Sequence, residues 1–239
     1  MQAASITNRG GRTSNEDHIS FAQAEGIWCF VLCDGLGGHL CGEIASKLVC
    51  DTVTEEFKKS PALSACSVRN YLEKAAFILG ETRENDSDKY NMSSTAVLLL
   101  TDGEKAVYAH SGDSRLYHLT NGSILSITKD HSLAYMEYES GSITYDEIRR
   151  SPNQNRLTRC INDIYGFSPE ISDIIELSKG DAFLLCSDGF WEYVTENDIE
   201  NTFRTSLSPK KWLRKMLSTL HENETDKNDN YSAIAVIIN

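Results

Sequence analysis

The order of apolar runs along the chain limits the folds that it can form. Short runs rich in Val, Ile, Leu and aromatic residues predict strands, and turn signals such as Asp102-Gly103 separate them. The predicted strands are Gly26–Cys33, Thr95–Leu100, Lys105–His110, Arg115–Leu119, Ile171–Leu177, Ala182–Cys186 and Tyr231–Ile238. Several follow one another with no helix between them, and Asn121-Gly122 predicts a tight hairpin. Strands joined by such short turns pair antiparallel.

Helical patterns interrupt the strands in two places. Apolar spacing predicts helices over Gly42–Lys58 and Val68–Leu79. Nearer the C-terminus, Thr195 with Asp198 has the spacing of a capping box, and Ser208-Pro209 marks a second helix start. Helix pairs embedded among serial strands disfavour a doubly wound parallel sheet. The order favours an α+β fold of two stacked antiparallel sheets with helices outside.

Composition favours one domain spanning residues 1–239. The chain has only 4 prolines, no repeat and no Ser- or Gly-rich tract that would mark a linker. Its longest apolar run, Ile27–Cys33, falls short of the roughly 20 residues that a membrane helix needs, and the first residues form no apolar signal core. The 7 cysteines lack a CxxC pair, which indicates buried, reduced thiols. We therefore expect a cytoplasmic protein.

The charge balance excludes two classes of partner. The chain has 35 acidic and 23 basic side chains, a formal net charge of -12. Nucleic acids and anionic membrane surfaces are bound through clustered Lys and Arg. We expect neither of them as a partner.

Acidic residues stand at the ends of several predicted strands. Asp34 and Asp188 each follow an apolar run and precede a glycine; Asp113 follows a third run, and Asp229 precedes the last. If these strands are neighbours, the carboxylates converge at one edge, where like charges need a cation to stay ionised. Oxygen ligands without His or Cys at metal spacing favour magnesium or manganese over zinc. Taken singly, each acid also fits an ordinary turn.

Two further segments carry candidate functional side chains. The loop from Asp34 to Glu43 is dense in glycine but lacks the P-loop pattern, so it gives no support for nucleotide binding. Within it, His39 could give a proton to a leaving oxygen, or be a solvated loop residue. Arg12 could bind a phosphate beside Glu16 and Asp17, or belong to a surface charge cluster.

Seven blocks in series resemble the PP2C, or PPM, family of metal-dependent protein serine/threonine phosphatases, in its compact bacterial form. The blocks are RTSNED (12–17), DGLGGHLCGEIAS (34–46), GDSRL (112–116), DHSL (130–133), NRLTR (155–159), SDG (187–189) and DN (229–230). The DGxGGH pattern is specific by itself, and the match covers nearly the whole chain. The resemblance implies a four-layer αββα sandwich, two antiparallel sheets flanked by helix pairs.

The resemblance also implies a centre of two Mn²⁺ or Mg²⁺ ions, with a third, weaker site. By position, the residues of this chain that match the family's ligands fall into three groups: those that bind the metals directly, those that bind through water, and one that binds the third metal. Asp34 would bridge the two metals, Gly35 would offer its carbonyl, Asp188 and Asp229 would bind directly, Glu16 and Asp17 would act through water, and Asp113 would hold the third ion.

The implied reaction is hydrolysis of phosphoserine and phosphothreonine by a hydroxide that bridges the metals, with Arg12 binding phosphate and His39 as general acid. The implied partners are phosphorylated proteins and a cognate serine/threonine kinase, and we expect a monomer. The segment Ala134–Gln154 corresponds to a variable flap that bears on substrate choice.

The sequence departs from the family pattern at a few positions. Asn228 stands where glycine is usual before Asp229, and Asn162 replaces a common glycine; neither would supply a ligand. Two other functions stay open: a binding or regulatory module of this fold without catalysis, and a phosphatase for phosphotyrosine or small phosphorylated metabolites. A sandwich whose acids only cap turns is the simplest alternative.

Overall fold

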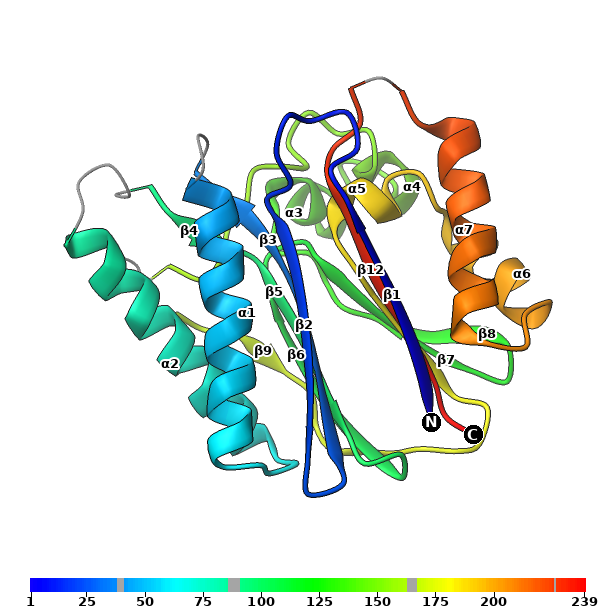
Figure 1. Ribbon diagram of the computed structural model, residues 1–239. Helices are drawn as coiled ribbons and strands as arrows, with labels where there is room; N and C mark the ends of the chain where they lie inside the picture. Colours follow the sequence, from blue (N-terminus) through cyan, green and yellow to red (C-terminus); the bar gives the residue numbers. More distant parts are fainter. Residues whose placement is uncertain (38–40, 86–90, 163–166, 226) are drawn as a thin grey trace.

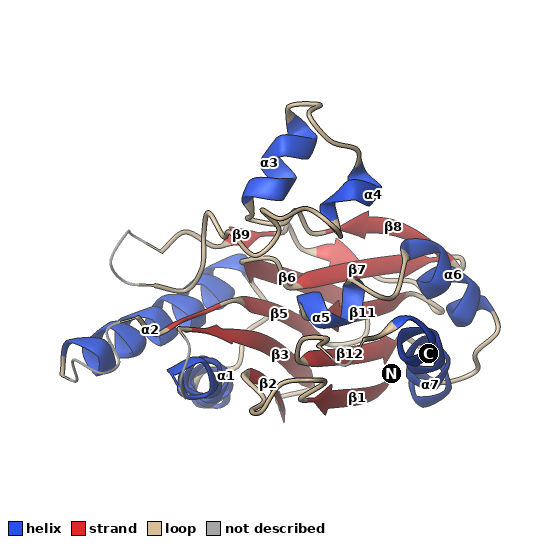
Figure 2. Ribbon diagram, turned by 90° about the horizontal axis from the view of Figure 1, so that it is seen from above, coloured by secondary structure: helices blue, strands red, loops and turns tan. Residues whose placement is uncertain are grey.

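The computed structural model describes residues 1–37, 41–85, 91–162, 167–225 and 227–239. Its strands form two stacked antiparallel sheets with helices outside each (Figures 1 and 2). The first sheet runs in the order β1 (Gln2–Asn8), β12 (Tyr231–Ile237), β11 (Ala182–Cys186), β7 (Arg115–Thr120) and β8 (Ser123–Ile127). The second runs β10 (Ile175–Glu176), β6 (Lys105–Ser111), β5 (Ala96–Thr101), β3 (Ile27–Leu36) and β2 (Asp17–Ala24), with β4 (Ser93–Ser94) on β3 and β9 (Glu170–Ile171) on β6.

A pair of helices covers the outer face of each sheet. Helices α1 (Cys41–Lys59) and α2 (Ala65–Glu84) lie on the second sheet, and α6 (Glu196–Arg204) and α7 (Pro209–Asn223) lie on the first (Figure 1). Three short helices stand at one end of the sandwich: α3 (Leu133–Glu139), α4 (Tyr145–Ile148) and α5 (Asp188–Trp191). Among the helices in these ranges, none combines the length and the apolar character that a bilayer crossing requires. The expected αββα layering is confirmed.

Strand β3 is buried on both faces, which explains its uninterrupted run of apolar residues. Phe30 and Leu32 point into the core between the sheets, whereas Val31 and Cys33 point into the core under α1 and α2. A strand buried on both faces has no solvent side, so polar alternation disappears. The same reasoning applies to β11, where Phe183 faces the core between the sheets.

Local signals for turns and caps are confirmed. Asn121 and Gly122 both have positive φ, 51° and 81°, as a two-residue hairpin turn of the type I′ class requires. Thr195 and Asp198 form the capping box of α6, and Ser208 caps α7 with a proline in its first turn.

The strand prediction was wrong in one segment and incomplete in two. Ile171–Leu177 is not one strand but two short ones, β9 and β10, which both pair with β6. Strands β1 and β2 were not predicted: each lies at a sheet edge, where β1 has no buried residue and most residues of β2 are partly buried or exposed. Edge strands bury too few side chains to show a strong apolar pattern.

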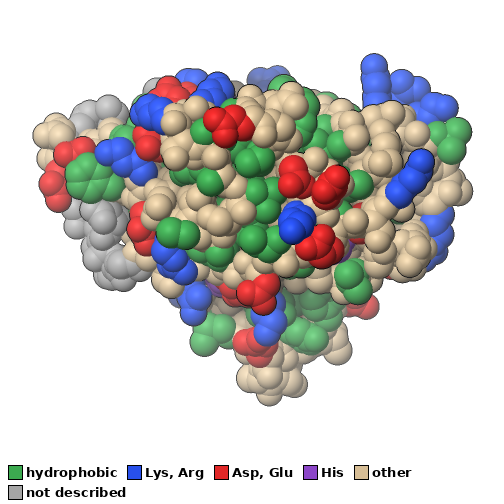
Figure 3. Space-filling view, turned by 90° about the horizontal axis from the view of Figure 1, so that it is seen from below, with side chains coloured by type: hydrophobic (Ala, Val, Ile, Leu, Met, Phe, Trp, Pro, Cys, Tyr) green, Lys and Arg blue, Asp and Glu red, His purple; other side chains and the backbone are tan. Residues whose placement is uncertain are grey.

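Acidic and basic side chains are interspersed with apolar ones on the molecule seen from below (Figure 3). The net charge of -12 is therefore not gathered into one acidic patch on this face.

Candidate functional site

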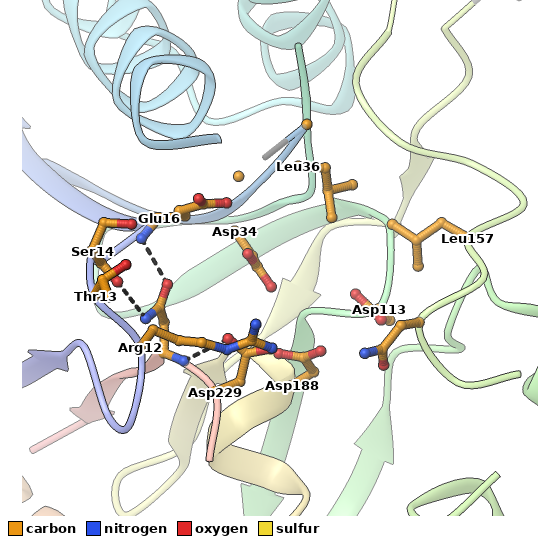
Figure 4. Close-up of a pocket in the computed structure, with 14 residues that line it drawn as sticks. Arg12, Thr13, Ser14, Glu16, Asp34, Leu36, Asp113, Leu157, Asp188 and Asp229 are labelled. Atoms are coloured by element: carbon orange, nitrogen blue, oxygen red, sulfur yellow. Dashed lines mark hydrogen bonds and ion pairs between the residues drawn. The ribbon is translucent and has the colours of Figure 1, made fainter. Parts of the chain in front are cut away.

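A cavity of about 340 Å³ opens at the end of the sandwich where β3 ends and α5 begins. Figure 4 shows the side chains of Asp34, Asp113, Asp188 and Asp229 directed into this cavity, with Arg12 at its rim. Its wall combines acidic, glycine and small polar residues: Arg12, Thr13, Ser14, Glu16, Asp34, Gly35, Leu36, Gly37, Asp113, Asn155, Leu157, Asp188, Asp229 and Asn230.

The four aspartates reach the cavity from strand ends that are far apart in sequence. Asp34 lies near the end of β3, and Asp188 opens α5 directly after β11. Asp113 follows β6, and Asp229 precedes β12. The sandwich stacks these strands so that the ends in question meet, which is the convergence expected from the sequence.

The backbone around Asp34 is held by hydrogen bonds to Thr95. The Asp34 N–H donates to Thr95 Oγ1 at 2.9 Å, and the Thr95 N–H donates to the Asp34 carbonyl at 2.8 Å. Gly35 follows because a Cβ there would lie 1.9 Å from the Gly42 carbonyl oxygen. Glycine thus permits the close approach of β3 to the start of α1.

Arg12 is tied to the acidic wall through Asp229. Its Nη2 lies 2.6 Å from Asp229 Oδ2, and the attraction of that carboxylate raises the pKa of the guanidinium. Asn230 fixes the loop that carries Arg12: its Nδ2 donates to the carbonyls of Arg9 and Ser14 at 2.8 and 2.9 Å. The first and last parts of the chain therefore meet at this cavity.

Asp17 lies beneath the cavity and does not form its wall. It is 5% exposed and pairs in register with Asp34 across β2 and β3. Ser187 Oγ donates to Asp17 Oδ2 at 2.7 Å, while Oδ1 has no hydrogen-bond partner among the residues that the structure describes. A buried carboxylate oxygen without a donor is costly.

The carboxyl groups strongly perturb one another. Burial first, and neighbouring acids second, raise the pKa of Asp34 and Asp188 well above the ordinary value. Burial, followed by other charges, raises the pKa of Asp17 and of Asp113 to about 7. Among the described residues of the cavity wall, Arg12 is the only cation. The acids therefore favour added positive charge, and an all-oxygen donor set of this kind fits Mg²⁺ or Mn²⁺.

The sequence-predicted site residues thus have three different placements. Arg12, Glu16, Asp34, Gly35, Asp113, Asp188 and Asp229 line the cavity, Asp17 lies beneath it, and His39 lies outside the described residues.

Several wall residues had no role in the sequence prediction. Thr13 and Ser14 fall inside the RTSNED block, and Asn155 and Leu157 fall inside NRLTR. Asn230 ends the last block. Their membership in those blocks was the available signal, but only the structure shows that they face the same cavity.

The whole chain is similar to known proteins. The family model described as protein phosphatase 2C matches residues 7–230. The serine/threonine phosphatase stp of Listeria welshimeri is 29% identical over 219 residues, which are 88% of this chain and 86% of that protein.

Solved structures match the fold throughout. The serine/threonine phosphatase Stp1 from Staphylococcus aureus superimposes with a TM-score of 0.90 at 29% identity, covering 99% of this chain and 94% of the other. The catalytic domain of the phosphatase PstP, in complex with two manganese ions, gives a TM-score of 0.84 at 25% identity, covering 100% and 98%.

Proposed function

This chain belongs to the protein phosphatase 2C family, and from that membership we propose that its acidic cavity hydrolyses phosphoserine and phosphothreonine in proteins. The observation that carries the proposal is the meeting of Asp34, Asp113, Asp188 and Asp229 with Arg12 in one cavity. Burial and mutual repulsion raise the pKa values of the Asp34 and Asp188 carboxyl groups, and a bound cation would offset the repulsion, so the arrangement supports a cation site.

We assign the metal ligands from this arrangement together with the family pattern. Asp34 and the Gly35 carbonyl, with Asp188 and Asp229, would hold two Mn²⁺ or Mg²⁺ ions, and Asp113 a third. Support for the pair comes from the two manganese ions in the PstP complex. When bound, such ions supply Lewis acidity, which activates water at neutral pH and offsets charge on the phosphoryl group.

Glu16 and Asp17 would contribute less directly. Glu16 lines the cavity, and its N–H donates to Asn230 Oδ1 at 2.7 Å, which ties it to the loop before β12. Asp17 stands behind Asp34 and would act on the centre through water.

Arg12 would orient the phosphate. Its side chain is 54% exposed, and only Nη2 is bonded to Asp229. The guanidinium has further N–H groups in one plane, which suit two oxygens of a phosphate. Asp229 thus aims Arg12 while leaving donors for the substrate.

His39 would be the general acid. It lies outside the described residues, at a sequence position between the end of β3 and the start of α1. A histidine with an ordinary pKa can donate a proton to the leaving serine or threonine oxygen near pH 7.

The proposed function is tested with purified protein and a phosphothreonine peptide. Phosphate release should require Mn²⁺ or Mg²⁺ and stop in EDTA. Asp34→Asn and Asp188→Asn should abolish turnover and manganese binding while the circular dichroism spectrum is unchanged. Asp51→Asn, on the exposed side of α1 beside Lys47, is the matched control and should retain full activity. Turnover in both cavity variants would contradict the metal assignment.

The substrate class needs a separate comparison. Values of kcat/KM for phosphothreonine, phosphoserine and phosphotyrosine peptides and for small phosphorylated metabolites should favour the first two. We further propose that the natural substrates are proteins phosphorylated by a cognate serine/threonine kinase.

A further inference from the structure

A cluster of two histidines and a glutamate lies outside the cavity wall. His110 lies near the end of β6, and Glu170 pairs with it on β9. The ring of His131 stacks on His110 with centroids 4.6 Å apart. Their ligand atoms lie within 4.8 Å of one another, so the group could in principle hold a metal ion. The hydrogen bonds of the two rings decide against that role.

The hydrogen positions follow from the fixed character of the backbone partners. His110 Nε2 lies 2.7 Å from the Lys129 carbonyl, which can only accept, so this nitrogen carries a hydrogen. The Gly112 N–H can only donate, and it meets His131 Nδ1 at 3.2 Å. His131 therefore uses its lone pair at Nδ1 and carries its hydrogen on Nε2.

The hydrogen on His131 Nε2 faces Glu170. The ring is buried, 7% exposed, and Nε2 makes no hydrogen bond to the described residues, although Glu170 Oε2 lies 3.5 Å from it. A metal ligand needs a free lone pair, and the single lone pair of the neutral His131 ring is already taken by Gly112. The nearby Glu170 carboxylate, whose side chain is 52% exposed, favours a hydrogen on Nε2 through electrostatic attraction and not through a hydrogen bond.

The bond to Gly112 bears directly on the cavity because Asp113 comes next. His131 and Gly112 are joined twice, since the His131 N–H also donates to the Gly112 carbonyl at 3.0 Å. Gly112 has φ of +108°, and a Cβ there would lie 2.6 Å from Thr95 Cγ2. This turn therefore packs tightly against Thr95. On its other side, Trp191 Nε1 donates to the Asp113 carbonyl at 2.9 Å.

We infer that His131 is a positioning residue of this site: its neutral imidazole accepts the Gly112 N–H and so fixes the turn that aims Asp113 into the cavity. The inference rests on the proposed function in one respect: the proposed function assigns a bound metal to Asp113. Burial, followed by the charges of His110 and Arg159, lowers the pKa of His131 to about 4, so the accepting form persists at neutral pH.

The same residue also holds the opposite wall. The Thr158 N–H donates to the His131 carbonyl at 2.8 Å, and Leu157 bridges to Ser132. Main-chain bonds of this kind survive substitution of the side chain. Changes of the imidazole therefore leave these main-chain bonds in place, and a pair of variants that both lose the stacking on His110 isolates the Gly112 bond.

The tautomer is tested first, by ¹⁵N NMR of the imidazole in metal-free protein. His131 should show an unprotonated Nδ1 and a protonated Nε2 from pH 6 to 8, and the Gly112 amide should exchange slowly with solvent. A hydrogen on Nδ1, or a charged ring at pH 7, would overturn the inference.

The second test compares two amides that mimic different ring nitrogens. In His131→Asn the side-chain oxygen can take the place of Nδ1 and accept from Gly112. In His131→Gln it reaches toward the place of Nε2 and leaves the Gly112 N–H without an acceptor. Gly112 amide exchange should be slow in the first variant and fast in the second.

Calorimetry with Mn²⁺ then measures the effect on the site. His131→Gln should weaken, by about 10-fold or more, the same manganese site that Asp113→Asn weakens, because loss of a partner behind a ligand costs 10–100-fold. His131→Asn should stay within about 3-fold of wild type. His221→Asn, on exposed α7, is the control and should have no effect.

Two results would overturn the inference: unchanged manganese affinity in His131→Gln, or an equal loss in both His131 variants. Neither NMR nor calorimetry requires turnover. A wild-type protein that binds manganese but releases no phosphate would contradict the proposed function, while these results would still decide the role of His131.

Discussion

At the scale of single residues, Ser187 provides a hydrogen bond that holds the buried carboxyl group of Asp17. Its Oγ donates to Asp17 Oδ2 at 2.7 Å and accepts the Ser232 N–H at 2.9 Å, and all of these groups are buried. Ser187→Ala leaves buried polar groups unsatisfied, so we expect a loss of about 1–3 kcal/mol in the free energy of unfolding. Urea denaturation in EDTA measures it, with exposed Ser218→Ala on α7 as the control. An unchanged stability would contradict the prediction.

Substitution of Arg12 should impair substrate binding without changing the stability of the fold. Because its side chain is half exposed, Arg12→Ala should leave the melting temperature unchanged. Loss of the phosphate donors should lower kcat/KM on the order of 10²-fold, as removal of one such donor does in other enzymes. Arg12→Lys, which keeps the charge but not the planar fork, should fall between. Steady-state kinetics on an aryl phosphate checks this order, and equal activity of all three proteins would refute it.

His39 is tested through the leaving group. A phosphothreonine alkoxide needs a proton to depart, whereas nitrophenolate leaves without one. His39→Asn should therefore slow the peptide reaction by about 10²-fold or more and p-nitrophenyl phosphate hydrolysis much less. Equal slowing of both substrates would rule out a general acid role.

At the scale of elements, one buried arginine connects β7 to the flap and to α5. Arg115 is 1% exposed, binds both oxygens of Asp130 at 2.8 and 2.7 Å, and stacks over the Trp191 ring at 3.5 Å. Glu196, which also binds Arg149 at the end of α4, lies 3.5 Å from Arg115 Nη1. Helix α4 is thus held to the same network that supports the turn at Asp113.

Asp130 is the critical partner in this network. Asp130→Ala leaves a charged guanidinium buried with Glu196 as its nearest carboxylate, at 3.5 Å, and the neutral Tyr117 hydroxyl, so we expect a loss of about 3–5 kcal/mol. The double change Arg115→Met with Asp130→Ala should lose less, because no buried charge remains. Thermal and urea unfolding measure both variants. A double variant less stable than the single one would contradict this explanation.

At the scale of the whole molecule, the acid cluster predicts how stability depends on pH and metal. Burial and neighbouring charges raise the folded pKa of Asp17 and Asp113 to about 7, against about 3.9 in an unfolded chain. Between about pH 4 and 7 the folded state therefore binds more protons, so the stability that these two groups contribute at low pH is lost over that range and changes little above it. The buried histidines, whose pKa values are lowered, act oppositely but only below about pH 6.5.

The measurement is the melting temperature between pH 6.5 and 8.5, with EDTA or with Mn²⁺. In EDTA, Asp17 and Asp113 should make it fall from pH 6.5 to just above 7 and contribute little slope beyond that. Manganese, which binds the ionised acids of the folded state, should raise it, and by more at higher pH. Asp113→Asn should flatten the slope in EDTA. A melting temperature that rises with pH in EDTA would contradict the assignment.

Much of the architecture could be predicted from local patterns. Three kinds of feature depend on neighbours within a few positions: the period of apolar residues, the caps of α6 and α7, and the Asn121-Gly122 turn. They can therefore be recognised in the sequence itself. The acids at strand ends were visible for the same reason. Strands β1 and β2 were not, because their partners, and not their own apolar content, make them strands.

The chain alone thus determined which residue types stand at which strand ends, and hence the prediction of a site for hard cations. Folding determined the rest: that Asp17 lies behind the cavity with Ser187, that Asn230 holds the loop of Arg12, and that Gly112 selects the tautomer of His131. Each of these depends on a hydrogen bond between segments distant in sequence or on burial. Both exist only once the two sheets are stacked, so no local pattern can contain them.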